Sequence, residues 1–275
     1  MLHYLAIFAA GMAAGTINTI VGSGSLITFP VLLALGYPPV TANISNSLGL
    51  VPGGLSGSWG YRRELSTQKR ALKILLPCSL AGGISGALLL LVLPAAAFTA
   101  IVPVLVALAV LLVAFQPLIQ RTVAKRRAAA AETTARDPSV PTDETAAEVG
   151  AGPSIQKYGL GVAAACFFCG VYGGYFGAAQ GVLLVGLFGV LLTDPLQTQN
   201  ALKNILVTCV NLIAAIVFVV IAINRLDWIV VAIIGVGSLL GGFLGARIGR
   251  RLPPIALRIV IVAVGTIAFV RLLMS

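Results

Sequence analysis

The stretch that decides the fold is residues 74–94, ILLPCSLAGGISGALLLLVLP, which contains no charged side chain. A helix of about 20 apolar residues is long enough to cross the roughly 30 Å hydrocarbon core of a bilayer. Residues 96–115, 205–223 and 228–246 form three more such runs. The sequence therefore predicts an all-α polytopic membrane protein, with the lipid bilayer as its solvent.

The composition supports this prediction and excludes a nucleic-acid surface. Apolar residues make up 59% of the chain and charged residues only 9%, whereas a soluble domain carries roughly 25% charge. The net charge of +10 gathers in residues 62–73, 121–157 and 247–258, between or beside the apolar runs. Basic loops of this kind indicate membrane topology.

The chain contains an internal repeat. AGGISGA at 81–87 and its closing Leu93-Pro94 recur 159 residues later as LGGFLGA at 240–246 and Leu252-Pro253. At a spacing of 155, Gly15 and Gly22 match Gly170 and Gly177, while Asn46 matches Asn204 at a spacing of 158. Internal duplication is typical of transporter folds.

We expect three regions: an N-terminal transmembrane repeat at 1–120, a disordered cytoplasmic linker at 121–157 and a C-terminal transmembrane repeat at 158–275. The linker is rich in charge, alanine and proline, so it cannot bury itself. Each repeat reads as five apolar segments, namely 2–21, 25–36, 40–60, 72–94 and 96–116, then 158–176, 179–193, 196–223, 228–247 and 255–273. The second segment of each repeat is too short to span comfortably, which predicts a broken helix or a re-entrant hairpin.

The loop charges predict that the repeats are inverted. In the first repeat the loop at 62–73 is basic and the loop around Pro94 is uncharged, whereas in the second repeat 224–227 is nearly neutral and 247–251 is basic. Equivalent loops then lie on opposite sides of the membrane. With the basic loops in the cytoplasm, both termini lie outside.

Lys203 is the clearest candidate for a functional residue, because it is the only basic residue between Tyr158 and Asn224. A charge at membrane depth is costly and is a functional hypothesis by default. Its spacing places it on one helix face with a set of polar residues, Asn200, Asn204, Thr208 and Asn211. This face suits an anionic solute. Two alternatives stay open: Lys203 snorkels or pairs with Asp194, and the amides join helices.

Two glycine-rich breaks form the second candidate. The first is Gly22-Ser23-Gly24-Ser25, and the second runs from Gly173 through Gly177 to Gln180. A helix that starts at such a break directs its unpaired N–H groups and positive dipole end at a ligand. The alternative is close helix packing, which we favour for Gly82-x-x-x-Gly86 and Gly241-x-x-x-Gly245. The first repeat adds Asn46 and Ser45, the latter opposite Lys203.

Residues for catalysis, metal binding or a cofactor are not found in the sequence. Cys166 and Cys169 have C-x-x-C spacing, but both lie in an apolar segment and the only histidine is His3. A redox pair needs an accessible thiolate, and a zinc site needs further ligands. We therefore expect no enzyme, and an intramembrane thiol redox protein is the alternative from another class.

The glycine pattern resembles the TauE/SafE family of sulfite-exporter-like permeases, also called the toluene-sulfonate uptake permease group. The resemblance covers nearly the whole chain except the linker and rests on ordered blocks: Gly11-x-x-x-Gly15, Gly22-x-Gly24 with Pro30, Gly53-Gly54 with Tyr61, and Gly82-x-x-x-Gly86-Ala87. It implies a prokaryotic transporter of the cytoplasmic (inner) membrane, and sulfite or sulfonates as the class of solute.

Together these observations predict a secondary transporter for a small sulfur-containing or organic anion, with alternating access between the two repeats. The expected partners are the anion and the bilayer, and a homo-oligomer is left open. An anion channel of the same fold is the closest alternative.

Overall fold

A computed structural model describes residues 2–136, 159–192, 194–248 and 254–274. Within these ranges the regular elements are helices and no strand occurs, which confirms the all-α prediction. Four helices are long and apolar enough to cross a membrane, at Lys69–Val92, Ala95–Leu118, Leu196–Arg225 and Trp228–Arg247. The chain is therefore a multi-pass membrane protein by the length and composition of its helices.

The first half begins with α1, Leu2–Ile20, and then follow α2, Ser25–Ala34; α3, Pro39–Gly49; α4, Val51–Gly60; α5, Arg62–Ser66; α6, Lys69–Val92; and α7, Ala95–Arg136. The expected single segment at 40–60 is thus two helices. They join at Leu50. Pro52 is in the first turn of α4, where an N–H group has no intrahelical acceptor and its loss costs nothing. Inside a continuous helix the same proline would remove a hydrogen bond and break the helix.

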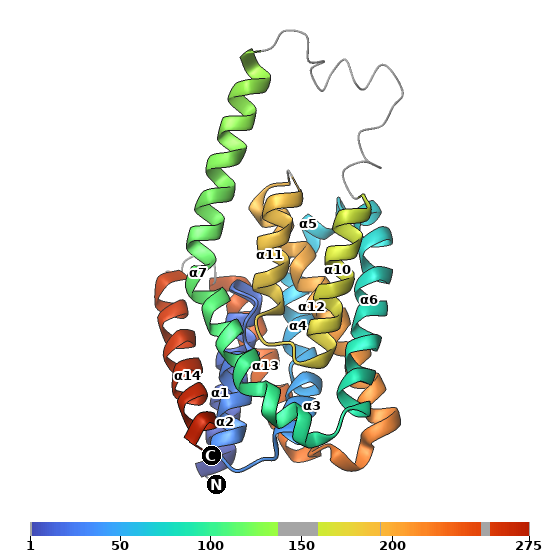
Figure 1. The fold of residues 1–275 in the computed structure, drawn as a ribbon, viewed down its shortest axis with the longest axis vertical. Coiled ribbons are helices and arrows are strands. Elements are labelled where there is room, and N and C mark those ends of the chain that lie inside the picture. Colours follow the sequence, from blue (N-terminus) through green and yellow to red (C-terminus); the bar gives the residue numbers. More distant parts are fainter. Residues whose placement is uncertain (1, 137–158, 193, 249–253, 275) are drawn as a thin grey trace.

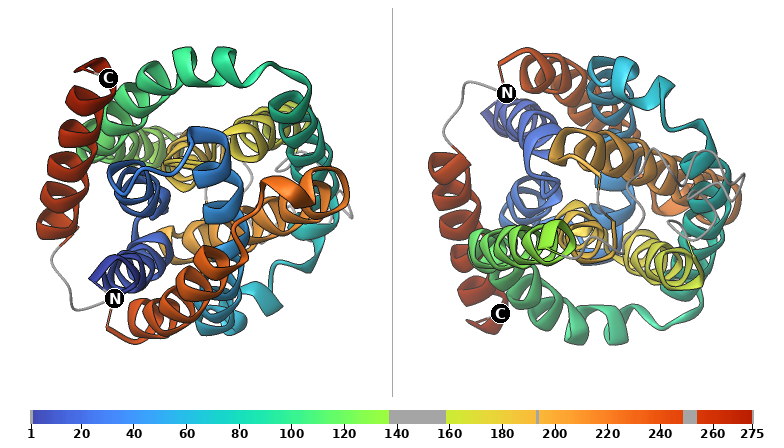
Figure 2. Two further views of the ribbon diagram at one scale, coloured as in Figure 1. Left: turned by 90° about the horizontal axis from the view of Figure 1, so that it is seen from below. Right: turned by 90° about the horizontal axis from the view of Figure 1, so that it is seen from above.

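The second half comprises α10, Leu160–Tyr175; α11, Gln180–Leu191; α12, Leu196–Ala222; the 3-10 turn η1, Ile223–Arg225; α13, Trp228–Ile248; and α14, Pro254–Met274. Figure 2 shows α14 at the edge of the bundle, where it packs against α7.

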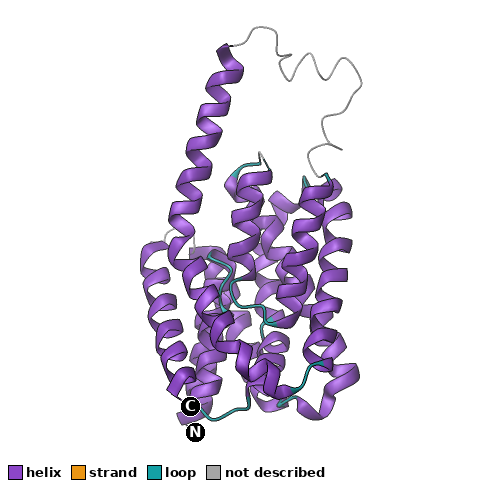
Figure 3. Ribbon diagram, in the orientation of Figure 1, coloured by secondary structure: helices purple, strands orange, loops and turns teal. Residues whose placement is uncertain are grey.

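The short second segments turn back instead of crossing. Figure 1 shows α11 beside α10 at one end of the molecule and α2 beside α1 at the other end. Each pair is joined by a loop inside the bundle, drawn in teal in Figure 3. These loops are Val21–Gly24 and Phe176–Ala179, so Ser25 and Gln180, which we expected in the breaks, are instead the first residues of α2 and α11.

Two equivalent loops of the topology prediction, 62–73 and 224–227, lie at opposite ends of the molecule. In Figure 1, α5 is at the upper end, while the turn η1 and both marked termini are at the lower end. This arrangement agrees with the opposite sides expected for residues 62–73 and 224–227.

Glycines allow α1 to pack on α13 and α10 to pack on α6. A Cβ on Gly241 would clash with the carbonyl oxygen of Met12, and a Cβ on Gly82 would clash with that of Phe167. Gly245 against Thr16 and Gly86 against Val171 repeat the pattern one turn later. The packing role predicted for these four glycines is therefore confirmed. The first helix of each half therefore packs on the helix that forms the fourth apolar segment of the other half.

Aromatic rings fill the space around the α10–α11 loop. The rings of Phe29 and Phe176 meet edge to face with centroids 5.2 Å apart, and those of Phe98 and Tyr175 are 5.6 Å apart. Phe29, Phe98 and Phe176 are almost completely buried. Such pairs add about 0.5–1.5 kcal/mol each beyond area burial, and they hold the hairpin tip in place.

The predicted linker needs one correction. Helix α7 continues through residues 121–136, which we expected to be disordered. The run Ala128–Ala131 and its basic neighbours have high helix propensity, so they extend a helix that the membrane has already nucleated. The rest of the expected linker, 137–157, lies outside the described residues.

The helix starts also correct the pairing of residues between the halves. Pro38 precedes α3 and Pro195 precedes α12, a spacing of 157 residues. At the same spacing, exposed Leu55 and Trp59 match exposed Leu212 and Ile216. Asn46 is therefore the counterpart of Lys203, whereas the sequence comparison paired Asn46 with Asn204 and Ser45 with Lys203.

Candidate solute-binding site

The tips of the two hairpins touch each other. The N–H of Gly181 donates to the carbonyl oxygen of Gly22 at 3.1 Å. A Cβ on Gly22 would lie 2.7 Å from the Cα of Gly181, and Gly22 has a φ of +92°. Only glycine fits such a backbone and such a contact easily. The two breaks therefore face each other.

Lys203 lies at this contact and is only 1% exposed. Its Nζ donates to the carbonyl oxygens of Asn18 at 3.2 Å and Thr19 at 3.3 Å, at the end of α1. The end of a helix carries partial negative charge, which stabilises a nearby cation. Lys203 is thus buried and bonded to these carbonyls, and its ammonium does not reach the surface as a snorkelling side chain would.

The polar residues on the Lys203 face of α12 contact different neighbours. Asn204 Nδ2 joins Lys203 and donates to the carbonyl of Thr19 at 3.2 Å. Thr208 instead contacts Ser58 at 3.3 Å, and the Oδ1 of Asn211 would lie 3.9 Å from a Cβ on Gly177. Asn200 is half-buried. The structure thus joins Lys203 and Asn204 at the end of α1, whereas Asn200 lies on the same face of α12 one turn earlier.

The start of α2 presents free hydrogen-bond donors beside Lys203. In the described part of the chain, the backbone N–H groups of Ser23, Gly24 and Ser25 have no acceptor. The hydroxyl of Ser23, 1% exposed, has no partner either. The Lys203 side chain is close by, because its Cδ would lie 3.1 Å from a Cβ on Gly22. Donors and positive charge at a helix start form an anion-binding arrangement.

The start of α11 has fewer free backbone donors than the start of α2, and it adds a buried side-chain amide. Its Gly181 N–H is already bonded to Gly22, and the N–H of Gln180 donates to Gly177 at 3.3 Å. The Gln180 side chain is completely buried, and neither its Oε1 nor its Nε2 has a partner among the described residues. Gly177 has a φ of +77° and closes the end of α10. Among the described residues, the backbone N–H groups of Ala178 and Ala179 have no acceptor, like those of Ser23 and Gly24 at the start of α2, and the free amide of Gln180 is added to them.

The first-half residues lie on the other side of the hairpin tips. Asn46 Oδ1 accepts a short hydrogen bond from Thr28, and its Nδ2 has no partner. Asn43 Nδ2 donates to the carbonyl of Tyr175 at 2.9 Å. Ser45 Oγ instead accepts from the N–H of Asp227 at 3.1 Å, which places it at a loop and outside the Lys203 group.

Sequence reasoning missed the backbone partners of the site. The carbonyls of Asn18 and Thr19 face Lys203 only because α1 stops at the hairpin tip. The side chains Asn43 and Thr28 were also left out of the predicted site. Each is an amide or hydroxyl in an apolar segment close to Asn46 or a break, and that position is the signal that finds them.

The thiols and apolar hollows do not add chemistry to this site. Cys166 and Cys169 are buried in an apolar cluster with Leu75, Leu184 and Phe188, so neither presents an accessible thiolate. Within the described ranges, no cluster of three metal-binding side chains occurs.

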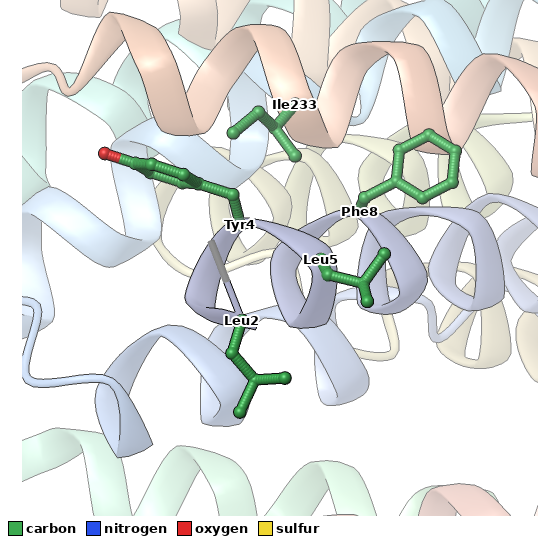
Figure 4. A pocket seen from close by; sticks show the side chains of 5 residues that line it. All are labelled: Leu2, Tyr4, Leu5, Phe8 and Ile233. Atoms are coloured by element: carbon green, nitrogen blue, oxygen red, sulfur yellow. The ribbon is translucent and has the colours of Figure 1, made fainter.

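Figure 4 shows a surface hollow between α1 and α13, lined by Leu2, Tyr4, Leu5, Phe8 and Ile233. The Tyr4 hydroxyl is the only polar side-chain group in its wall. This surface suits lipid chains and lacks the donors that a polar solute needs.

A bundle of membrane-spanning helices with hairpin tips and a buried cation at its centre defines a class, the solute transporters of membranes. The sulfite exporter TauE/SafE family matches residues 7–272. The chain therefore belongs to the TauE/SafE family of membrane transporters, which confirms the resemblance read from the glycine pattern.

Relatives support the same class. The chain is 28% identical over 247 residues to the probable membrane transporter protein YfcA of Escherichia coli K12, covering 90% of this chain and 79% of the relative. A probable membrane transporter protein of Haemophilus influenzae is 27% identical over 241 residues, covering 88% and 83%. Protein ORF9 of Sinorhizobium sp., also a probable membrane transporter, is 35% identical over 104 residues, covering 38% and 40%. No solved structure matches significantly.

Proposed function

We propose that this protein is a secondary transporter that carries a small anion by alternating access between two inverted halves. The observation that carries the proposal is Lys203. It is a buried ammonium where the two hairpin tips meet, beside three free backbone N–H groups. Burial of a lysine at the helix centre costs about 2.5–3.5 kcal/mol on insertion scales, and a transported anion gives that cost a function.

The packing between halves supports the inverted repeat. The contact of Gly241 with Met12 matches that of Gly82 with Phe167 when the halves are exchanged. The hairpins α1–α2 and α10–α11 enter from opposite ends of the bundle. Inverted repeats let one half rock against the other around a fixed site.

Lys203 also suggests how the solute drives the motion. It comes from α12 in the second half and is bonded to the end of α1 in the first half. An anion that accepts a hydrogen bond from the ammonium competes with those carbonyls. Binding of the anion would then loosen the connection between the halves. The anion would thereby favour a conformation in which the halves have separated, and such a difference in affinity is what a population shift requires.

The charge and the donors of the site favour a sulfur oxyanion or a sulfonate as the solute, carried across the cytoplasmic membrane of a bacterium. Three N–H groups in sequence suit a head group that carries three oxygens, as sulfite and sulfonates do. The family description, sulfite exporter, points to the same chemistry. Basic loops on one side of the bundle favour the inner membrane, with both termini outside.

Anion binding to the purified protein tests the proposal. Sulfite, methanesulfonate, sulfate and acetate are titrated while heat of binding is measured, on the parent, Lys203→Met and Lys203→Arg. We expect Lys203→Met to lose at least tenfold in affinity, and Lys203→Arg to bind with altered selectivity because a planar fork replaces a point charge.

The control is Lys73→Met, which removes an exposed lysine of α6 and should bind like the parent. If Lys203→Met folds and binds anions as tightly as the parent, the proposal is wrong and the ammonium has only a structural role.

A further inference from the structure

Helices α1 and α10 end in the same way. The N–H groups of Val21 and Gly22 both donate to the carbonyl of Ile17, at 2.7 and 3.1 Å. The N–H groups of Phe176 and Gly177, each 155 residues later, both donate to the carbonyl of Tyr172, at 2.9 and 3.0 Å. The next two carbonyls are therefore presented to the bundle interior in equivalent places.

These carbonyls differ between the two halves in the hydrogen bonds that they accept. At the end of α1, the carbonyls of Asn18 and Thr19 receive the Lys203 ammonium and the Asn204 amide. At the end of α10, the equivalent carbonyls of Gly173 and Gly174 receive no hydrogen bond from any described residue. A helix end carries partial negative charge, so one end has its cation and the other lacks one.

Polar side chains with free oxygens surround the end of α10. The completely buried Gln180 amide packs directly against Gly173, and neither of its polar atoms has a partner. Asn43, 1% exposed, is held at Tyr175 through its Nδ2 and leaves its Oδ1 without a partner. Buried polar atoms are rarely left unpaired without a ligand or water.

The sequence explains why the residue equivalent to Lys203 does not bond to the carbonyls at the end of α10. The counterpart of Lys203 is Asn46, whose side chain is bonded to Thr28 of α2 and is too short to reach as a lysine does. The stem of Lys203 also passes between Gly22 and Gly181. At a spacing of 155, Gly22 corresponds to Gly177, whereas Gly181 corresponds to Leu26, which is larger and buried.

From this asymmetry we infer a sodium-binding site at the end of α10, formed by the carbonyls of Gly173 and Gly174 with Oε1 of Gln180. The ion occupies the place that the Lys203 ammonium holds in the other half. Neutral oxygens suit a monovalent ion, whereas calcium and magnesium sites rely on carboxylates. Ends of broken helices coordinate sodium in other transporters. The sodium site does not depend on which solute is carried. Only the use of the bound sodium as a coupling ion rests on the proposed function.

Thermal unfolding of the purified full-length protein, without any substrate anion, tests the site. The unfolding temperature is measured in NaCl, KCl and choline chloride at one ionic strength. A ligand that binds only the folded state raises this temperature in a saturable manner. We expect a rise of about 5 °C at saturating NaCl, a smaller rise in KCl and none in choline chloride.

Two variants locate the effect. Gln180→Leu should unfold at the same temperature in NaCl and in choline chloride, because it removes a ligand oxygen. The double variant Leu26→Gly/Asn46→Lys supplies a tethered ammonium with room for its stem, and it should likewise lose its response to sodium. The matched control, Ser85→Ala on the exposed face of α6, should respond like the parent.

A parent protein that unfolds alike in the three salts overturns the site, as does a sodium response that persists unchanged in both variants. These outcomes leave the proposed function intact, since anion binding is measured separately in saturating NaCl. Loss of anion binding with a normal sodium response would contradict the proposed function alone.

Discussion

At the scale of the residue, the molecule concentrates its unusual chemistry around a few small side chains. Gly22 and Gly181 bring two hairpin tips into backbone contact, and this contact leaves space for the stem of Lys203. The ammonium then satisfies two carbonyls that the end of α1 leaves open. A buried charge is tolerable here because hydrogen-bond acceptors are already oriented toward it.

Alanine at the tips tests this contact. A Cβ on Gly181 would lie 2.6 Å from the Cα of Gly22, and Gly22 itself has a positive φ. We expect Gly181→Ala and Gly22→Ala each to lower stability by about 1–3 kcal/mol through overpacking and strain, measured as a lower unfolding temperature.

Gly161→Ala is the matched control, because a Cβ there meets nothing within 4 Å. It should be neutral or raise stability by up to about 1 kcal/mol through helix propensity. Equal losses in all three variants would show that the tips are not a special contact.

Much of this site was accessible from the sequence, and the reason is physical. Lys203, Asn204 and the two glycine breaks stand out because charge and broken helices are costly in a membrane. The carbonyl partners of Lys203 could not be predicted, because they depend on how far α12 lies from α1. The misplacement of Ser45 has the same cause: its partner Asp227 comes from a distant loop.

At the scale of the element, helix ends decide the architecture. The apolar runs predicted most helices to within a few residues, since a span needs about 20 apolar residues. The sequence did not reveal that 40–60 divides at Leu50. It also placed the start of the linker too early. Both errors concern helix boundaries, which depend on local capping and neighbours as much as on hydrophobicity.

Asp227 offers a direct test of one such boundary. Its Oδ1 accepts from the N–H groups of Ile229 and Val230, both at 3.0 Å, at the start of α13. Asp227→Ala should lower stability by about 1 kcal/mol because these donors lose their cap, whereas Asp227→Asn should be close to the parent. Thermal unfolding in detergent measures both. A neutral Asp227→Ala would mean that water replaces the cap fully.

At the scale of the whole molecule, each half is completed by the other. The first helix of each half packs through glycine contacts on the helix that forms the fourth apolar segment of the other half, so each half covers an interface of the other. The two halves are therefore held together by two equivalent interfaces. Their orientation in the membrane is a prediction from the charges of the loops.

Labelling of single cysteines tests that orientation. In a background without Cys78, Cys166, Cys169 and Cys209, Thr67→Cys should react with an impermeant maleimide only from the cytoplasmic side. Arg225→Cys should react only from outside. Both positions are exposed. Labelling from the same side would contradict the inverted arrangement, and full transport by the cysteine-free background would remove a thiol mechanism.

The measurement that tests the central claim most directly is counterflow in proteoliposomes. Vesicles loaded with the unlabelled anion that binds best, such as sulfite, are diluted into a trace of the same anion carrying a radiolabel. A transporter with alternating access should accumulate the label transiently above equilibrium, with a rate that saturates, and Lys203→Met should abolish this accumulation. Label that only equilibrates, as through a channel, or counterflow that is undiminished in Lys203→Met, would contradict the account.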